Sequence, residues 1–297
     1  MSGPTPDGVI DVPGGVIDLM VQLHPPGQIS IPVPKELLRD EESLASWPSP
    51  GIVDYLFDGA GERARMAEQP KQVVAEFDRW GIAGGLLTVP AEEFDAMLEF
   101  LDDEISRFWI AVRVDPHGGM RSVRALEHAA QTCDRVKAAA VTPLGTLPQI
   151  PLDAKEYYPI YAKCVELDLP LCTPVGIPGP KVPARCQDPM ALDEVCWFFP
   201  ELKVVMKHGG QPWADVCAHL LRKWPNLYYA TSGYAPHRYP AEIVTLLRGR
   251  NAGKVLFAGY WPLLSYDRIF KEIDELALSD DARAAFLSDN ARRVFGL

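Results

Sequence analysis

The sequence predicts an α/β protein, a single (β/α)8 TIM barrel that ends in additional helices. Three observations favour this fold: a length of 297 residues, a regular alternation of short apolar runs with amphipathic stretches, and about eight such units in one unbroken series. Barrels of this class typically contain about 250 residues. An open doubly wound sheet is the alternative, but no GxGxxG turn follows the first apolar run.

The N-terminal part of the chain departs from this alternation. Residues 1–15 are rich in Pro and Gly and lack hydrophobic periodicity, so we expect a loosely ordered lead-in before a barrel that spans 16–297. The apolar run at 16–21 is typical of a buried first strand. The Pro-bearing segment 25–65 that follows is expected to be a long insertion, and a loop of this length usually has a function such as a lid.

After the insertion, β-branched apolar runs predict buried parallel strands and apolar residues at a 3.6-residue period predict the helices between them. The expected strands lie near 85–89, 109–114, 136–141, 170–175, 203–206, 227–230 and 254–258. The expected helices lie near 69–80, 91–106, 120–133, 154–167, 189–199, 213–224, 240–248, 266–276 and 280–295.

Composition narrows the classes of partner and compartment. The net charge of −11 argues against a nucleic-acid or anionic-membrane partner and says little else. A small-molecule substrate is expected from the functional hypotheses given below. No apolar run reaches the roughly 18 residues that a membrane span needs. The start MSGPTPDG has no signal-peptide pattern, so a cytoplasmic protein is expected. The six cysteines form no CxxC pair and are expected to be reduced, mostly buried thiols.

The segment KVVMKHGGQPW at 203–213 is the first candidate for chemistry. Its strand ends at a charged, glycine-bearing corner that contains His208. Catalytic groups collect at the carboxyl ends of strands in parallel α/β folds, so His208 is predicted to be functional. A histidine bound into a tight turn is the alternative. Lys207 precedes it, and strand alternation is expected to turn this lysine to the other face, against a helix.

Polar residues also follow the third and seventh expected strands. Arg113 is predicted either to clamp a substrate carboxylate with its planar fork or to pair with a carboxylate such as Asp115. Tyr234, His237 and Arg238 are candidates for the wall of a pocket, although PHRYP can equally be a turn that begins a helix. Ser232 as a nucleophile with His208 as its base lacks an identifiable acidic partner.

Five segments of the second half match a known family in order. LPLCTPVG, FPELKVVMKHGGQPW, WPNLYYATSGY, GKVLFAGYWP and SDNARRVFGL resemble landmarks of the amidohydrolase-related family, the branch of the amidohydrolase superfamily that contains metal-dependent decarboxylases and hydrolases. The resemblance runs from about residue 15 to 297. It implies a barrel whose divalent metal is held by an HxH pair after the first strand, a His ending the fifth and an Asp after the eighth, with a His after the sixth as acid/base.

The resemblance breaks at the metal ligands. The HxH positions correspond to Met20 and Gln22, the fifth-strand His to Pro174 and the eighth-strand Asp to Tyr260, so that only His208 is retained. A thioether, an amide, a proline and a phenol cannot form the first coordination shell of Zn²⁺ or Mn²⁺. We therefore expect no metal and no cofactor. Since barrels of this family commonly pair, a homodimer is an option that the resemblance implies.

Four residues at the ends of the first and eighth strands are expected near the pocket. Tyr260 and Trp261 occupy the place of the acidic ligand and predict an aromatic floor, although they can simply fill the hole left by the metal. Gln22 and His24 follow the first strand. His24 is expected either to face the cleft or to belong to the turn HPP.

The leading functional hypothesis is a metal-independent hydrolase acting on a small organic acid, ester or lactone. His208 is the predicted general acid/base, Tyr260 lies near the reacting atom, and Arg113 or Arg238 clamps the anion. The first alternative is a lyase, a decarboxylase or dehydratase, acting on a small organic acid. The second is a non-catalytic barrel that binds a small molecule or a partner protein.

Overall fold

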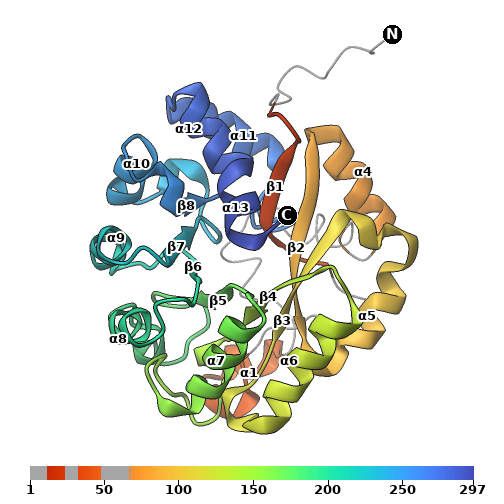
Figure 1. Ribbon diagram of the computed structural model, residues 1–297, viewed down its shortest axis with the longest axis vertical. Helices are drawn as coiled ribbons and strands as arrows, with labels where there is room; N and C mark the ends of the chain where they lie inside the picture. The colour runs from red at the N-terminus through yellow and green to blue at the C-terminus, as the bar shows by residue number, and fades with distance from the viewer. Residues whose placement is uncertain (1–11, 24–32, 48–66, 68) are drawn as a thin grey trace.

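The predicted barrel is confirmed by a computed structural model that describes residues 12–23, 33–47, 67 and 69–297. Eight parallel strands neighbour one another in chain order, β1 to β8, and the helices lie outside them (Figure 1). The last strand returns to the first: the backbone N–H of Leu19 donates to the carbonyl of Phe257 at 3.2 Å, and that of Gln22 donates to Trp261 at 2.8 Å. These bonds join the end of the chain of strands to its start, so that the barrel is nearly closed.

The strands and most helices lie within a few residues of the positions that the sequence predicts. The helix Glu41–Ser46 falls within the expected insertion and is not among the predicted elements, and the helix expected at 280–295 is two α-helices separated by a π-helical turn at Ala285–Asp289. The strands are β1 (Val16–Val21), β2 (Ile82–Pro90), β3 (Phe108–Arg113), β4 (Val136–Ala140), β5 (Leu171–Pro174), β6 (Val204–Lys207), β7 (Leu227–Ala230) and β8 (Val255–Leu256). The helices are α1 (Glu41–Ser46), α4 (Pro70–Trp80), α5 (Phe94–Leu101), α6 (Met120–Thr132), α7 (Tyr158–Glu166), α8 (Ala191–Phe198), α9 (Ala214–Lys223), α10 (Ala241–Leu247), α11 (Tyr266–Glu275), α12 (Asp280–Ala284) and α13 (Asn290–Phe295).

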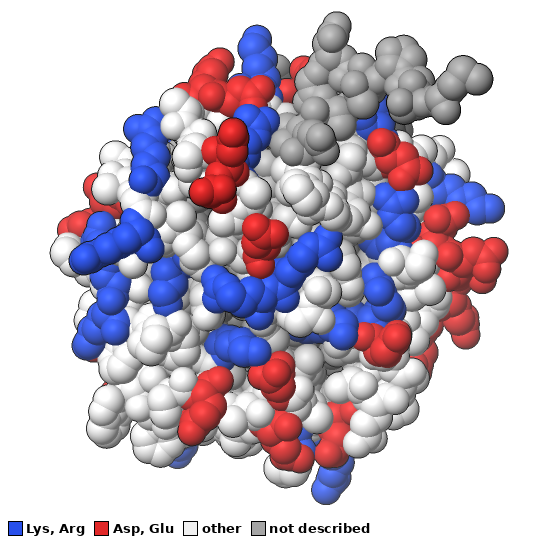
Figure 2. All heavy atoms as spheres, turned by 45° about the horizontal axis from the view of Figure 1, so that its top comes forward, with Lys and Arg blue, Asp and Glu red and all other residues white. Residues whose placement is uncertain are grey.

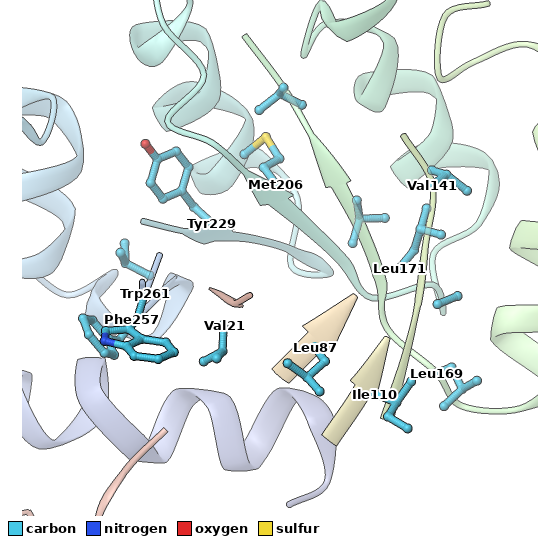
Figure 3. Packing of buried hydrophobic residues seen from close by; sticks show 14 of the residues in the cluster. Val21, Leu87, Ile110, Val141, Leu169, Leu171, Met206, Tyr229, Phe257 and Trp261 are labelled. Atoms are coloured by element: carbon cyan, nitrogen blue, oxygen red, sulfur yellow. The ribbon is translucent and has the colours of Figure 1, made fainter. Parts of the chain in front are cut away.

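Side chains on the strands form two apolar layers. The inner layer draws on all eight strands through Ile17, Leu19, Leu86, Trp109, Ala111, Ala138, Ala140, Cys172, Val205, Ala230, Leu256 and Ala258. The outer layer packs between strands and helices, and Figure 3 shows part of it, including Val21, Leu87, Ile110, Met206, Phe257 and Trp261. The pattern follows from the two-residue period of strands, which sends successive side chains to opposite faces.

Most of the expected lead-in and insertion lies outside the described residues. Within the described part of 25–65, Val33 and Leu38 pack against Leu144 from the loop after β4. Lys181, in the loop after β5, reaches Glu42 of α1 at 2.7 Å. This part of the segment therefore rests on loops at the carboxyl ends of the strands.

The surface charge and the helix lengths concern two kinds of partner that the sequence argues against, nucleic acids and membranes. Figure 2 shows Asp and Glu interspersed with Lys and Arg on one face, so the net charge of −11 does not gather there in a single acidic patch. Among the described residues, every helix is too short or too polar to cross a bilayer.

Candidate functional site

A cavity of about 760 Å³ opens at the carboxyl ends of the barrel strands. This is the end where TIM barrels place their active sites, because the loops there vary while the strands stay fixed. Its wall combines apolar residues, such as Leu87 and Val141, with a smaller number of polar groups. Six of the residues that the sequence nominates line it: Gln22, Arg113, His208, Tyr234, Arg238 and Tyr260.

Three of the nominated residues are not among those that line the cavity. Trp261 is 2% exposed and lies in the outer core layer (Figure 3), and its ring stacks on Tyr266 with centroids 6.1 Å apart. His237 is exposed, and its Nδ1 lies 2.8 Å from a carboxylate oxygen of Glu272 on α11. The sequence suggests that Trp261 and His237 contact the substrate, but their positions do not favour such a contact. His24 lies outside the described residues.

His208 enters the cavity wall through a left-handed backbone conformation, with φ of 66°. Its backbone N–H donates to Ser232 Oγ at 3.1 Å, and the same Oγ lies 3.2 Å from Nδ1 of the ring. The Ser232 hydroxyl either donates to Nδ1, which places the proton of the neutral ring on Nε2, or accepts a second hydrogen bond from Nδ1–H.

The charge state of His208 follows from its surroundings. Burial, assisted by the charge of Lys207, lowers the pKa of His208 from 6.5 to about 3. The imidazole is therefore neutral at neutral pH. A general acid/base with an apparent pKa near the working pH needs a different environment.

Tyr260 lies beside His208 at the end of β8. Its backbone is also left-handed, with φ of 63°, and the two rings meet edge to face with centroids 5.3 Å apart. Burial raises the pKa of the Tyr260 hydroxyl to about 12, and a hydrogen bond with Gln22 opposes that shift. The phenol keeps its proton across the neutral range and presents a polar O–H in the cavity wall.

Lys207 is a site residue that the sequence reasoning misses. Strand alternation from His208 assigns it to a helix-facing position, but it lines the cavity and is 4% exposed. Lys207 follows Val205, an inner-layer residue, by two positions and therefore shares its face. The left-handed turn at His208 brings the next side chain back to the same mouth. Because β6 is buried throughout, its polarity does not reveal which face points inward.

The charged groups of the cavity wall are mainly cationic. Arg113, Lys207, Arg238 and Arg268 line it, whereas Glu93 is the only carboxylate among the described lining residues. Burial lowers the pKa of Arg113, and the nearby Glu92 and Glu93 raise it. A guanidinium retains its charge through such shifts. The cavity is thus suited to a small anion that also has apolar surface.

Fold and cavity together define a (β/α)8 barrel with a cavity at the carboxyl ends of its strands. The amidohydrolase family model matches residues 67–297. The match covers more than half of the 297 residues, so the chain belongs to the amidohydrolase family. No curated protein matches the sequence.

Several solved structures share the fold. An uncharacterized TIM-barrel protein from Bordetella bronchiseptica is 20% identical, with a TM-score of 0.73 over 95% of this chain and 98% of that one. The 5-carboxyvanillate decarboxylase of Novosphingobium aromaticivorans, solved with bound manganese, is 15% identical, with a TM-score of 0.71 over 95% and 97%. A 2,6-dihydroxybenzoate decarboxylase from Rhizobium is 14% identical, with a TM-score of 0.63 over 95% and 98%.

The described residues do not fit the metal centre that the family implies. No three His, Cys, Asp or Glu side chains gather in a metal-holding group within the described ranges. At the mouth, the ammonium of Lys207 lies 3.3 Å from the thioether sulfur of Met20, which pairs a weak donor atom with a cation. The nearby carboxylate of Asp18 accepts from the N–H groups of Met20 and Gly259 and from the hydroxyl of Tyr266, at 2.7 to 2.9 Å.

Proposed function

We propose that this chain is a metal-independent lyase that decarboxylates a small organic acid in the cavity at the barrel mouth. The observation that carries the proposal is the cationic lining, in which Arg113 and Lys207 stand at the ends of β3 and β6. Arg113 holds a carboxylate through its planar fork, and the apolar wall accommodates the rest of the substrate.

Decarboxylation makes modest demands on the protein. The carbon–carbon bond to the carboxylate breaks, its electron pair stays on the substrate, and a proton replaces carbon dioxide. The cavity provides protonated groups for the last step, because burial raises the pKa of the Tyr260 hydroxyl to about 12. Lys207 provides a nitrogen that can hold or release a proton next to the same space.

Hydrolysis, the leading expectation from the sequence, receives less support from the cavity. It needs an activated water or a nucleophile beside a base. His208, with a pKa of about 3, is a weak base. Ser232 is fully buried and is not among the lining residues, so its hydroxyl does not face a substrate.

The similar solved structures are compatible with this choice. Two of those described above are decarboxylases of aromatic carboxylic acids. That activity belongs to those proteins, and the low identity carries over the fold alone. The family membership nevertheless makes a carboxylic acid a reasonable first class of substrate to test.

The decisive experiment measures carbon dioxide release from a panel of hydroxybenzoates and 3-oxo acids by chelator-treated protein of determined metal content. We expect release that matches the acid consumed and is unchanged by added manganese or zinc. Arg113→Met is expected to lower kcat/KM about 30-fold or more, on the order of 2 kcal/mol, because a buried carboxylate loses its partner.

The matched control is Arg79→Met, which removes a guanidinium that is 63% exposed on α4 and should leave kcat/KM unchanged. Activity that appears only with added metal contradicts the proposal. Products that retain every carboxylate point to hydrolysis. Saturable binding of an acid in calorimetry, with no product from any acid, indicates a non-catalytic barrel.

A further inference from the structure

We propose that Lys207 forms a covalent imine with a ketone of the substrate, so that the acids this barrel decarboxylates are 3-oxo carboxylic acids. This inference rests on the proposed function and adds the nucleophile and the substrate class to it. It starts from the place of Lys207, which is buried in the inner face of the barrel yet borders the cavity.

The surroundings of Lys207 offer few hydrogen bonds or opposite charges that would stabilise its charged form. An ammonium has three N–H donors. Nζ donates to Met20 Sδ at 3.3 Å, and Lys207 takes part in no salt bridge with the described residues. A thioether is a weak acceptor, so a buried ammonium here remains largely unsatisfied.

The carboxylate of Asp18 does not supply the hydrogen bonds that the Lys207 ammonium lacks. Asp18 acts on Lys207 electrostatically, but its oxygens accept hydrogen bonds from Met20 N, Gly259 N and the hydroxyl of Tyr266. Burial outweighs that attraction and lowers the pKa of Lys207 below its ordinary value. A larger fraction of the amine is therefore neutral and nucleophilic than for a lysine in water.

The neighbouring strand adds no competing nucleophile. Cys172 lies on the inner layer of β5 and borders the same cavity. Burial raises the pKa of the Cys172 thiol, so it stays protonated and weakly reactive. Pro174 pairs with Lys207 in the β5–β6 register and has no side-chain donor or acceptor. The lysine amine is thus the strongest nucleophile on this part of the wall.

The reaction balances with groups already named. The neutral amine of Lys207 adds to the ketone, and loss of water with uptake of one proton gives an iminium ion. The bond to the carboxylate then breaks, carbon dioxide leaves, and the electron pair moves to the iminium nitrogen to form an enamine. Protonation of the enamine carbon and addition of water release the ketone and the free amine. The net reaction converts a 3-oxo acid and a proton into a ketone and carbon dioxide.

The other cavity groups have consistent parts in this scheme. Arg113 holds the carboxylate until carbon dioxide leaves. In a 3-oxo acid this departure leaves the electron pair on the carbon next to the iminium carbon. Tyr260 and His208 lie beside one another in the cavity wall, with ring centroids 5.3 Å apart. The protonated Tyr260 hydroxyl can assist the departure of water from the first adduct and the protonation of the enamine.

Reductive trapping tests the inference directly on the wild-type protein. The protein is incubated with acetoacetate or benzoylacetate, treated with sodium borohydride and mapped by peptide mass spectrometry. We expect the peptide that contains Lys207 to gain the reduced ketone skeleton without the carboxyl group, an isopropyl group in the case of acetoacetate. Butanoate, which has no ketone, should give no adduct.

Variants separate the amine from the charge of Lys207. Lys207→Arg keeps the cation but cannot form the imine, and it is expected to lose the adduct and to lower kcat on the order of 10³-fold. Lys203→Arg, at an exposed ion pair with Asp168 just before β6, should retain both the adduct and the activity. Circular dichroism establishes that each variant is folded, and the wild-type result stands without them.

The outcomes distinguish this inference from the proposed function. Carbon dioxide release with no adduct at Lys207 overturns the imine and leaves the decarboxylase in place. An adduct at Lys207 that retains the carboxyl group supports the imine and contradicts decarboxylation. No adduct and no turnover with either acid overturns the assignment of the substrate class.

Discussion

Two buried titratable groups near the barrel mouth respond to pH in opposite directions. Burial raises the pKa of Asp18 from 3.8 to about 6, although hydrogen bonds from Met20 N, Gly259 N and Tyr266 oppose the shift. Burial lowers the pKa of His208 from 6.5 to about 3. Each group therefore prefers to be neutral in the folded chain, as expected where the surroundings solvate charge poorly.

Asp18 is predicted to destabilise the fold as the pH rises. The folded chain holds this proton to about pH 6, whereas the unfolded chain releases it near 3.8. The stabilisation is therefore complete below about pH 4 and is lost by about pH 6, a change on the order of 3 kcal/mol. Asp18→Asn removes this dependence, so the unfolding free energy of wild type minus variant should fall by about that amount between pH 4 and 7.

Urea unfolding at four pH values measures that difference. Subtraction cancels the contribution of His208, which has the opposite sign: its stabilisation is complete above about pH 6.5 and is lost as the pH falls toward 3. Asp103→Asn, at an exposed position after α5, is the matched control and should give a constant difference. A constant difference for Asp18→Asn would mean that its carboxyl titrates normally in the folded protein.

The junction of β8 with β1 is the element on which closure of the barrel depends. A Cβ added at Gly259 would lie 2.6 Å from Asp18 Oδ2 and 3.1 Å from ring atoms of Phe257 and Tyr266. The Gly259 N–H also donates to Asp18 at 2.7 Å. Gly259 thus lets the two strands approach closely enough for the buried carboxylate to bridge them.

Gly259→Ala is predicted to lower the unfolding free energy by about 2 kcal/mol, because the methyl group forces Asp18 from its hydrogen bonds. Gly253→Ala, whose nearest Cβ neighbour would be 3.4 Å away, should cost much less. Denaturant unfolding of both variants tests this. In an Asp18→Ala background the cost of Gly259→Ala should shrink, since the clashing oxygen is gone. Equal costs in both backgrounds would assign the effect elsewhere.

Regular elements were predictable from the sequence, whereas the direction of side chains at strand ends was not. The run Val204–Lys207 predicts β6 because all its residues suit a buried parallel strand. Alternation fails at the next residue, because His208 adopts a positive φ without being glycine. Tyr260 does the same after β8, so Tyr260 faces the cavity while Trp261 enters the outer core. Single non-glycine left-handed residues leave no periodic trace in a sequence.

At the scale of the whole molecule, the cavity lies at one end of the barrel, and the C-terminal segment packs against the other end and stabilises the fold. α13 places Ala291, Val294 and Phe295 against the inner layer of the barrel. The chain is also tied to the start of β1, because Ser288 Oγ donates to the carbonyl of Gly15 at 2.9 Å and Arg292 donates to that of Gly14 at 2.6 Å. Figure 1 accordingly shows the C-terminal helix beside β1 and β8.

Because these contacts lie at the end of the barrel opposite to the cavity, a variant there is predicted to lower the stability of the fold without changing the cavity. Phe295 is 4% exposed and contributes to the inner layer from the end of the barrel opposite to the cavity. Phe295→Ala is expected to lower the unfolding free energy by about 3 kcal/mol or more, through lost burial and a residual cavity. Borohydride trapping at Lys207 in the folded variant should match wild type, because strands hold the cavity wall independently of the packing beneath them.

Phe198→Ala provides the comparison for the same change of side chain. Phe198 ends α8 and is 55% exposed, so its loss removes little buried surface and should cost less than about 1 kcal/mol. Urea unfolding and the trapping yield are measured on both variants. If Phe295→Ala lowered the trapping yield of folded protein as well as its stability, the inner layer would be transmitting packing changes from one end of the barrel to Lys207 at the other. In that case a displacement at one end would reach the other through the close-packed inner layer, which includes Ala138 and Ala140.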